Sequence, residues 1–237
     1  MLIHNAGGDR NFFTYQVKTL KKHGNILLLD LPGHGNSPAM DKNSITDSSN
    51  IIYEICKELN LSNICLIGLN NGANIALNIF SQNDLPINSM ILIDPPLFMN
   101  EKFVKEINEF IGILIGGYLE DFINSLVNNL FIKTDEINKN IALNSFMSSD
   151  KNSLQEMFKS LIEWDKNSEN VLKNIRCQTL CILTDEHHCS YNKLKGIAPS
   201  FEIGKVIGSK CWATLEVPEQ INAMIERFLD IGIKKAV

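Results

Sequence analysis

The chain has 237 residues, of which 44% are hydrophobic, and a formal charge of −5 from 22 basic and 27 acidic side chains. These values describe a globular chain with one large domain, and they exclude disordered and fibrous proteins. Because the basic residues form no run, we expect neither a nucleic-acid partner nor attachment to an acidic membrane surface.

Neither end of the chain nor its cysteines suggest export. No basic region with a cleavage site follows Met1, and the apolar stretch 110–119 is too short to span a bilayer. The six cysteines show no Cys-x-x-Cys spacing, and a core of this size needs no covalent cross-links. We therefore predict reduced thiols and a cytoplasmic location, with no cofactor.

Short apolar, β-branched runs alternate with amphipathic segments along most of the chain. This alternation predicts right-handed β-α-β crossovers, and hence an α/β fold with a mostly parallel sheet and helices on both faces. The predicted strands are residues 2–3, 26–29, 64–67, 90–93, 180–183 and 203–207. The predicted helices between them are 13–22, 45–59, 72–80 and 218–229.

Residues 95–165 interrupt this rhythm with four helical stretches, 101–114, 119–130, 135–146 and 153–164, and no strand-like run. We predict that residues 95–165 form an inserted helical cap over the carboxyl ends of the strands, and that 1–94 and 166–237 form the core. Large apolar residues at helical spacing should pack inside the cap, with some facing the cleft. They are Phe103, Phe110, Leu114, Tyr118, Phe122 and Phe131.

Four short sequence motifs, which we call landmarks, follow one another along the chain. They are His4-Asn5-Ala6-Gly7-Gly8, Asp30-Leu31-Pro32-Gly33-His34-Gly35-Asn36-Ser37, Gly68-Leu69-Asn70-Asn71-Gly72 and Leu215-Glu216-Val217-Pro218-Glu219. In this order they resemble the α/β-hydrolase fold family of the helical-cap type, and the second landmark is the most specific. The resemblance covers essentially the whole chain. The family's N-terminal hairpin has no counterpart before residue 2. Either the natural chain starts upstream, or the sheet has an exposed edge that must be short, covered or paired with another chain.

The resemblance also implies where a catalytic triad would lie. The family's third landmark is Gly-x-Ser-x-Gly, a sharp turn that presents the nucleophile, and here Asn70 takes the serine's place. A carboxamide nitrogen is not a useful nucleophile, although Asn tolerates the positive φ of such a turn. His188 stands where the family has its acid, and Cys211 where it has its histidine. All three triad positions are therefore substituted, which predicts that serine hydrolase activity is absent.

The oxyanion side departs from the family pattern as well. The family's His-Gly pair is His4-Asn5 here, but the loop that continues through Ala6 could still point backbone N–H groups into the pocket. With the N–H of Asn71, this loop predicts a site for a carbonyl or anionic oxygen. His4 and His34 match family residues that hold loops beside the pocket. Asp94 follows the strand before the cap, at a rim position where the family sometimes supplies an acid, but its Asp-Pro-Pro sequence is equally a chain-turning device, which we favour.

The cysteine and histidine side chains allow two further interpretations. His188 and Cys211 occupy positions whose counterparts touch, so a reactive thiol–imidazole pair is conceivable, although a short Cys side chain should not reach the elbow. His187, His188, Cys189 and Cys211 are of types that suit zinc, but their spacing matches no paired ligand template, so we predict no metal.

Three functions remain open from the sequence. The first is a hydrolytically silent protein that binds a small, mostly apolar ligand under the cap, or a protein partner or second copy at the exposed sheet edge. The second is a lyase, isomerase or oxygenase that uses the residual oxyanion pocket. The third is a thiol-dependent hydrolase or acyltransferase that uses Cys211 and His188. Likeness of fold does not choose among them.

Overall fold

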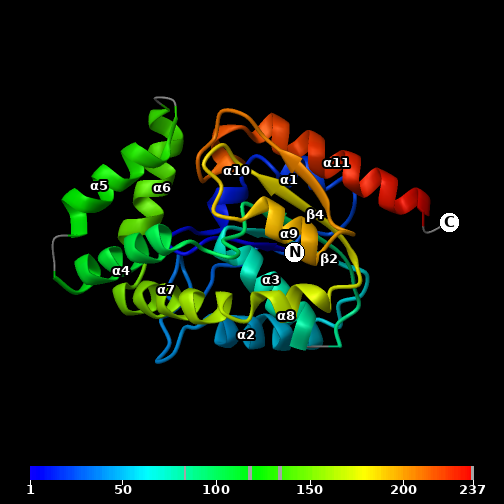
Figure 1. The fold of residues 1–237 in the computed structure, drawn as a ribbon, viewed down its shortest axis with the longest axis horizontal. Helices are drawn as coiled ribbons and strands as arrows, with labels where there is room; N and C mark the ends of the chain where they lie inside the picture. The colour runs from blue at the N-terminus through cyan, green and yellow to red at the C-terminus, as the bar shows by residue number, and fades with distance from the viewer. Residues whose placement is uncertain (83, 117–118, 133–134, 236–237) are drawn as a thin grey trace.

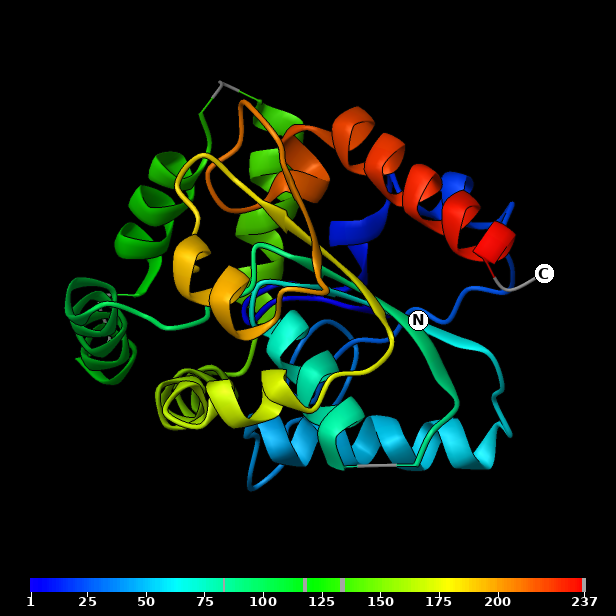
Figure 2. The same ribbon diagram turned by 45° about the vertical axis from the view of Figure 1, so that its right-hand side comes forward.

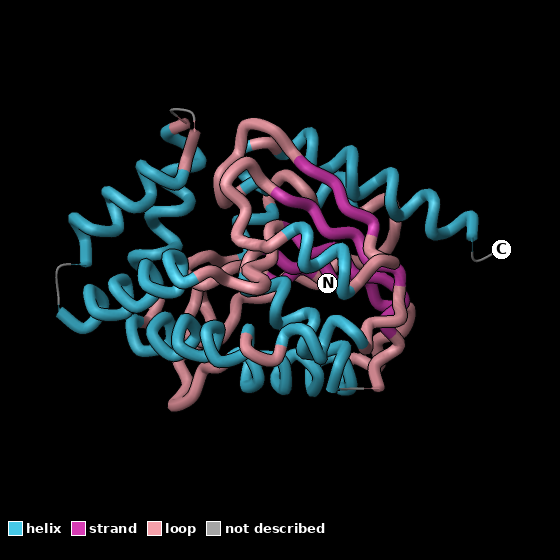
Figure 3. Tube along the Cα trace, in the orientation of Figure 1, coloured by secondary structure: helices cyan, strands magenta, loops and turns pink. Residues whose placement is uncertain are grey.

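A parallel sheet of five strands forms the centre of the computed structural model, which describes residues 1–82, 84–116, 119–132 and 135–235. The strands lie side by side in chain order, and helices enclose them (Figure 3). They are β1 (Leu2–Ile3), β2 (Ile64–Leu69), β3 (Ile87–Ile93), β4 (Gln178–Leu183) and β5 (Glu202–Lys205). The predicted α/β class and parallel sheet are confirmed.

Residues 26–29 were predicted as a full strand, and that prediction is wrong. The segment runs along the outer side of β1, where the Leu2 N–H donates to the Leu27 carbonyl and one isolated bridge pairs Leu2 with Leu28. Because β1 has only two residues, it offers too little backbone for a longer ladder. Residues 26–29 thus lie on one side of β1, and β2, the next strand along the chain, lies on the other side. This reversal makes the carboxyl ends of β1 and β2 the topological switch point, where open sheets bind ligands.

Helices cover both faces of the sheet (Figure 1). On one side lie α2 (Ile45–Glu58), α3 (Asn71–Gln82) and α8 (Ser168–Lys173), and on the other α1 (Val17–Leu20) packs against α11 (Pro218–Lys235). The remaining short helices are η1 (Arg10–Phe13), α9 (Tyr191–Ile197) and α10 (Ala213–Glu216). The helix predicted over 13–22 is instead broken into η1 and α1. Between them Gln16 is fully buried and donates to the Thr214 carbonyl, which holds the chain at the break.

Four helices lie between β3 and α8, close to where the sequence predicts them. They are α4 (Glu101–Gly116), α5 (Leu119–Leu130), α6 (Glu136–Ser148) and α7 (Lys151–Asp165). Helices α4, α5 and α6 stand away from the sheet to one side, whereas α7 runs beside α2 (Figures 1 and 2). Hydrogen bonds join α7 to the rest of the chain. For example, Ser160 Oγ accepts from the Ile45 N–H, and the Asp165 carboxylate accepts from the Phe98 N–H.

Aromatic side chains fill the space among these four helices, as predicted. The Phe110 ring packs with its centroid 5.6 Å from that of Phe122 and 5.1 Å from that of Phe158. Phe103 instead faces the sheet and lies against the ring of His188. Tyr118 lies outside the described residues. Among the helices of the described ranges, none combines the length and apolar character needed to cross a bilayer.

Gly72 gives a direct test of how closely α3 approaches β1. A Cβ at this position would lie 2.3 Å from the Ile3 carbonyl oxygen and 2.5 Å from that of His4, and backbone cannot easily move away. We expect Gly72→Ala to lower the free energy of unfolding by about 1–3 kcal/mol. The control is Gly112→Ala in α4, where a Cβ meets nothing within 4 Å. Because Ala favours a helix more than Gly does, this variant should raise the free energy of unfolding by up to about 1 kcal/mol. Urea denaturation measures both, and equal effects would contradict this packing.

Candidate active site at the strand ends

The turn between β2 and α3 keeps a strained geometry although it holds no serine. Asn70 has φ +47°, in the left-handed region that few residues other than Gly and Asn adopt. The two flanking glycines allow the turn to close, since a Cβ on Gly68 would lie 2.4 Å from the Gly72 carbonyl oxygen. The sequence-based expectation that Asn preserves this elbow is confirmed.

Asp94 lies directly beside Asn70 because β2 and β3 are in register up to the pair Leu69 and Ile93. The Asp94 side chain is fully buried, and its backbone also has a positive φ of +47°. Asn70 Nδ2 donates to Asp94 Oδ2 at 3.3 Å and to the Asp94 carbonyl at 3.2 Å. From the sequence we noted that Asp94 follows a strand at a position where an acid is sometimes supplied, but we favoured a chain-turning role. The contact with Asn70 shows that its side chain belongs to the site.

His188 also binds Asp94. Its Nδ1 lies 3.1 Å from Asp94 Oδ2, and its backbone N–H donates to Oδ1 at 3.4 Å. Because a carboxylate only accepts hydrogen bonds, Nδ1 donates to Asp94 Oδ2. On the other side of the ring the Phe103 centroid lies 4.2 Å away. His188 thus has a carboxylate partner.

Cys211 completes the group, and its sulfur reaches the elbow, contrary to our expectation. Sγ donates to Asn70 Oδ1 at 3.6 Å, and the Cys211 carbonyl accepts from Asn70 Nδ2 at 3.5 Å. Burial, followed by the nearby charges of Asp94 and Glu216, raises the pKa of this thiol well above its usual value. We call Asn70, Asp94, His188 and Cys211 the elbow cluster.

The predicted contact between His188 and Cys211 takes a different form. Within the described residues, His188 bonds through its ring to Asp94, whereas Cys211 bonds through its sulfur to Asn70. Donor atoms of Asp94, His188 and Cys211 nevertheless all lie within 4.8 Å of one another. The two other nearby acids are engaged elsewhere, Asp185 with Lys205 at 3.4 Å and Glu186 with Lys210 at 3.5 Å.

The loop that was predicted to bind an oxygen has its Ala6 N–H already bonded to another side chain, so that prediction is corrected. The Ala6 N–H donates to Asn71 Oδ1 at 2.7 Å, so it is not free to bind an oxygen in the pocket. Asn5 Nδ2 turns back to the Ala6 carbonyl at 2.9 Å. Asn71 begins α3 beside this loop, so its side chain reaches the loop backbone and replaces an external acceptor. Above the loop, the Phe146 ring packs where any side chain at Gly7 would have to go.

His4 and His34 lie beneath the loop and are buried side chains with a 5.3 Å ring separation. Both ring nitrogens of His4 are used, since Nδ1 donates to the Asn5 carbonyl and Nε2 accepts from the Leu31 N–H at 2.8 Å. His34 Nδ1 donates to the Pro32 carbonyl at 2.9 Å. Burial, and next the neighbouring His34, lower the pKa of His4 to about 3. These contacts join two loops and leave His4 no nitrogen for a ligand.

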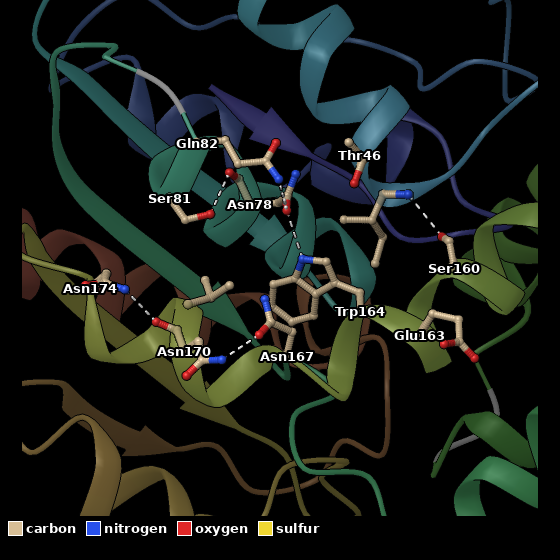
Figure 4. Close-up of a pocket in the computed structure, with 12 residues that line it drawn as sticks. Thr46, Asn78, Ser81, Gln82, Ser160, Glu163, Trp164, Asn167, Asn170 and Asn174 are labelled. Carbon is tan, nitrogen blue, oxygen red and sulfur yellow. Dashed lines mark hydrogen bonds between the residues drawn. The ribbon is translucent and has the colours of Figure 1, made fainter.

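A surface cleft of about 530 Å³ lies apart from the elbow cluster, between α2, α3, α7 and α8 (Figure 4). At its centre the Trp164 indole donates to Asn78 Oδ1 at 3.0 Å. Amides and hydroxyls dominate its lining, and none of the elbow cluster contributes. The lining residues are Ile45, Thr46, Asn78, Ser81, Gln82, Ser160, Glu163, Trp164, Asn167, Asn170, Val171 and Asn174.

Comparison with known proteins finds likeness to the alpha/beta hydrolase fold. A family model described as alpha/beta hydrolase fold matches residues 1–170. A putative esterase/lipase of Haemophilus influenzae is 23% identical over 238 residues, which cover 97% of this chain and 82% of that protein. The dihydrolipoyllysine-residue acetyltransferase component of the acetoin cleaving system of Pseudomonas putida is 29% identical over 80 residues. That match covers 33% of this chain and only 22% of the acetyltransferase component.

Solved structures agree with this assignment. A structure from work on carboxylesterases of the thaumarchaeon Nitrososphaera gargenis superposes with a TM-score of 0.86 at 18% identity, over 99% of this chain and 90% of that one. At this identity the likeness establishes the fold alone. The fold and the residue-level geometry must therefore be weighed separately when activity is considered.

The buried His4 makes stability depend on pH. Its pKa is about 3 when folded and about 6.5 when unfolded, so below pH 6.5 the unfolded chain binds a proton that the folded chain does not. The protonation of His4 in the unfolded chain should therefore lower the free energy of unfolding by about 2 kcal/mol as the pH falls from 6.5 to 4.5. Urea titrations at several pH values should show that His4→Gln flattens the profile, whereas His23→Gln, on the partly exposed surface, does not. Parallel profiles for wild type and His4→Gln would contradict the assignment.

Proposed function

The chain belongs to the alpha/beta hydrolase fold family, and on that premise we propose that it is a hydrolytically silent member that works by binding. It keeps the sheet, the strained elbow and the helices α4 to α7, and we interpret these four helices, residues 95–165, as the family's cap. Its elbow holds no serine, and residue 211 is not a histidine. We further infer that it acts in the cytoplasm, which agrees with the six free cysteines.

The state of Asn70 supports this proposal most strongly. Its carboxamide nitrogen is not nucleophilic, and both ends of the amide are already bonded, Nδ2 to Asp94 and Oδ1 to Cys211. The family's base position holds a protonated thiol, which cannot accept a proton from an attacking group. The elbow therefore presents a satisfied amide in the place where a hydrolase presents an activated hydroxyl.

The closed oxyanion loop supports the proposal independently. Stabilising a tetrahedral intermediate needs preorganised N–H donors aimed at the developing negative charge. Here the Ala6 N–H already donates to Asn71 Oδ1 at 2.7 Å, and it would have to exchange that bond for one to the substrate. This arrangement also weakens the alternative of a lyase, isomerase or oxygenase that depends on the same oxyanion pocket.

The surface above the elbow cluster indicates what kind of ligand would fit. Phe103 lies against the His188 ring, and Phe146 covers Gly7 and packs near Trp212, with ring centroids 6.0 Å apart. Aromatic walls over a small polar cluster favour a small, mostly apolar ligand under the cap. A protein partner or second copy along residues 26–29, at the edge of the sheet, is the other candidate for binding.

Activity-based labelling tests the absence of esterase chemistry. We expect p-nitrophenyl ester hydrolysis at the rate of buffer alone and no labelling by a fluorophosphonate probe. Asn70→Ser restores a hydroxyl at the elbow but no base at residue 211, so it should also remain unlabelled. An active serine esterase in the same assay checks the probe. Labelling of wild type, or of Asn70→Ser at residue 70, would contradict the proposal.

One observation favours a second candidate, a thiol-dependent hydrolase or acyltransferase. The Asp94 carboxylate orients the His188 imidazole, and the Cys211 sulfur lies within 4.8 Å of the donor atoms of both. With Asp94 as the acid, His188 as the base and Cys211 as the nucleophile, the arrangement resembles a cysteine protease triad. Against it, the pKa of Cys211 is raised, whereas a nucleophilic thiol needs a lowered one.

Alkylation separates the two candidates. With iodoacetamide at pH 7, we expect Cys211 to react no faster than Cys177, a half-buried thiol elsewhere whose pKa burial raises to about 11. Mass spectrometry of digested protein follows each site, and both thiols should react rapidly once urea has unfolded the chain. Selective modification of Cys211 in the folded protein, abolished by His188→Gln, would instead support the thiol-dependent enzyme.

A further inference from the structure

Three different metal-binding side chains converge in the elbow cluster. Asp94 follows β3, His188 lies in the loop after β4, and Cys211 lies in the loop before α10. One donor atom from each, a carboxylate oxygen, an imidazole nitrogen and a sulfur, lies within 4.8 Å of the other two. Within the described residues, no other group of three His, Cys, Asp or Glu side chains meets this condition.

We propose that Asp94, His188 and Cys211 form a binding site for a single Zn²⁺ ion. Zinc takes sulfur, imidazole nitrogen and carboxylate oxygen together, whereas Mg²⁺ and Ca²⁺ prefer oxygen alone. Three protein ligands leave a fourth tetrahedral position for water or another oxygen. This site goes beyond the proposed binding function, since it needs neither an apolar ligand nor hydrolysis.

The charge of the site fits a divalent cation. Asp94 is fully buried, and the hydrogen bonds to its side chain within the described residues come from the neutral amide of Asn70 and from His188. When Zn²⁺ binds, Cys211 releases its proton to solvent and coordinates as thiolate. Two negative ligands then balance two positive charges, so the complex as a whole is neutral and burial costs little.

The surroundings restrict the geometry of the three ligands. Asn70 contacts two of them at once, donating to Asp94 Oδ2 and lying 3.6 Å from the Cys211 sulfur. Phe103 covers one face of the His188 ring and limits access of water. Ligands of tetrahedral zinc lie roughly 3–4 Å apart, given bonds of about 2.0–2.3 Å. The three donor atoms now lie within 4.8 Å of one another, so only small side-chain movements would bring them to the spacing of zinc ligands.

Sequence spacing could not reveal this site. Residues 94, 188 and 211 are far apart in the chain, and local templates such as paired Cys-x-x-Cys do not describe them. The sequence-based zinc hypothesis used His187 and Cys189, but His187 Nδ1 lies against the Thr184 carbonyl at 3.2 Å and Cys189 is buried at the bridge to Leu97. The set that the fold assembles replaces both with Asp94.

Cobalt titration of the full-length protein tests the proposal. After removal of metals with a chelator, CoCl₂ should bind one ion per chain and produce a thiolate-to-cobalt charge-transfer band in the near ultraviolet, together with the intense visible bands of a tetrahedral site. Addition of ZnCl₂ should displace the cobalt and abolish these bands. Because the readout is spectroscopic, its outcome is separate from that of the esterase and labelling assays.

Variants locate the site. Cys211→Ser should remove the charge-transfer band, and Asp94→Asn and His188→Gln should each weaken cobalt binding by at least about 10-fold. The matched controls are Cys177→Ser and His187→Gln, which should leave the spectrum and affinity unchanged. Circular dichroism of the metal-free variants checks that each is folded. If Cys211→Ser fails to fold, blocking of Cys211 alkylation by ZnCl₂ in wild type gives the same information.

Two outcomes would overturn the zinc site. One is a wild-type protein that shows no charge-transfer band with CoCl₂ and whose Cys211 alkylation ZnCl₂ does not slow. The other is a band that persists in Cys211→Ser and disappears in Cys177→Ser, which would place the metal elsewhere.

Discussion

A carboxylate shielded from water must find hydrogen-bond donors or a cation, and this requirement organises the site around Asp94. The side chain is fully buried at the end of β3. Asn70 supplies an amide N–H, and His188 supplies a ring N–H and a backbone N–H. If these donors were removed, an unsatisfied charge would be left in the interior at a cost of several kcal/mol. Asn70 and His188 thus have a structural role, because they satisfy a buried acid.

The backbone around this acid is held in a strained geometry. Asn70 and Asp94 both have φ +47°, and the glycines beside Asn70 leave no room for a Cβ. The strain persists because the parallel register of β2 and β3, together with the close approach of α3 to β1, fixes the turn. A scaffold of this kind conserves the position of a functional group without conserving its chemistry. The same position can therefore hold a nucleophile in one protein and a supporting amide in another.

Much of the fold followed from the sequence, because apolar periodicity and the ordered landmarks report on burial directly. The four helices α4 to α7 and the positive φ of Asn70 were predicted correctly. The ladder at 26–29 was not, since its length depends on a neighbouring strand. The bond between Ala6 and Asn71, and the role of Asp94, join residues distant in sequence through polar contacts that leave no periodic trace. Asn is also frequent throughout the chain, so an individual Asn carried little information.

The hydrogen bond between Asn70 and Asp94 stabilises the buried carboxylate, and a double-mutant cycle measures its coupling energy directly. Glycine at each position removes the side chain and still allows the positive φ, so Asn70→Gly, Asp94→Gly and the double variant isolate the contact. Free energies of unfolding from urea denaturation at pH 7 should show a coupling energy of about 1–3 kcal/mol. Effects that add to within about 0.5 kcal/mol would show that the amide does not support the buried carboxylate, and would contradict the account.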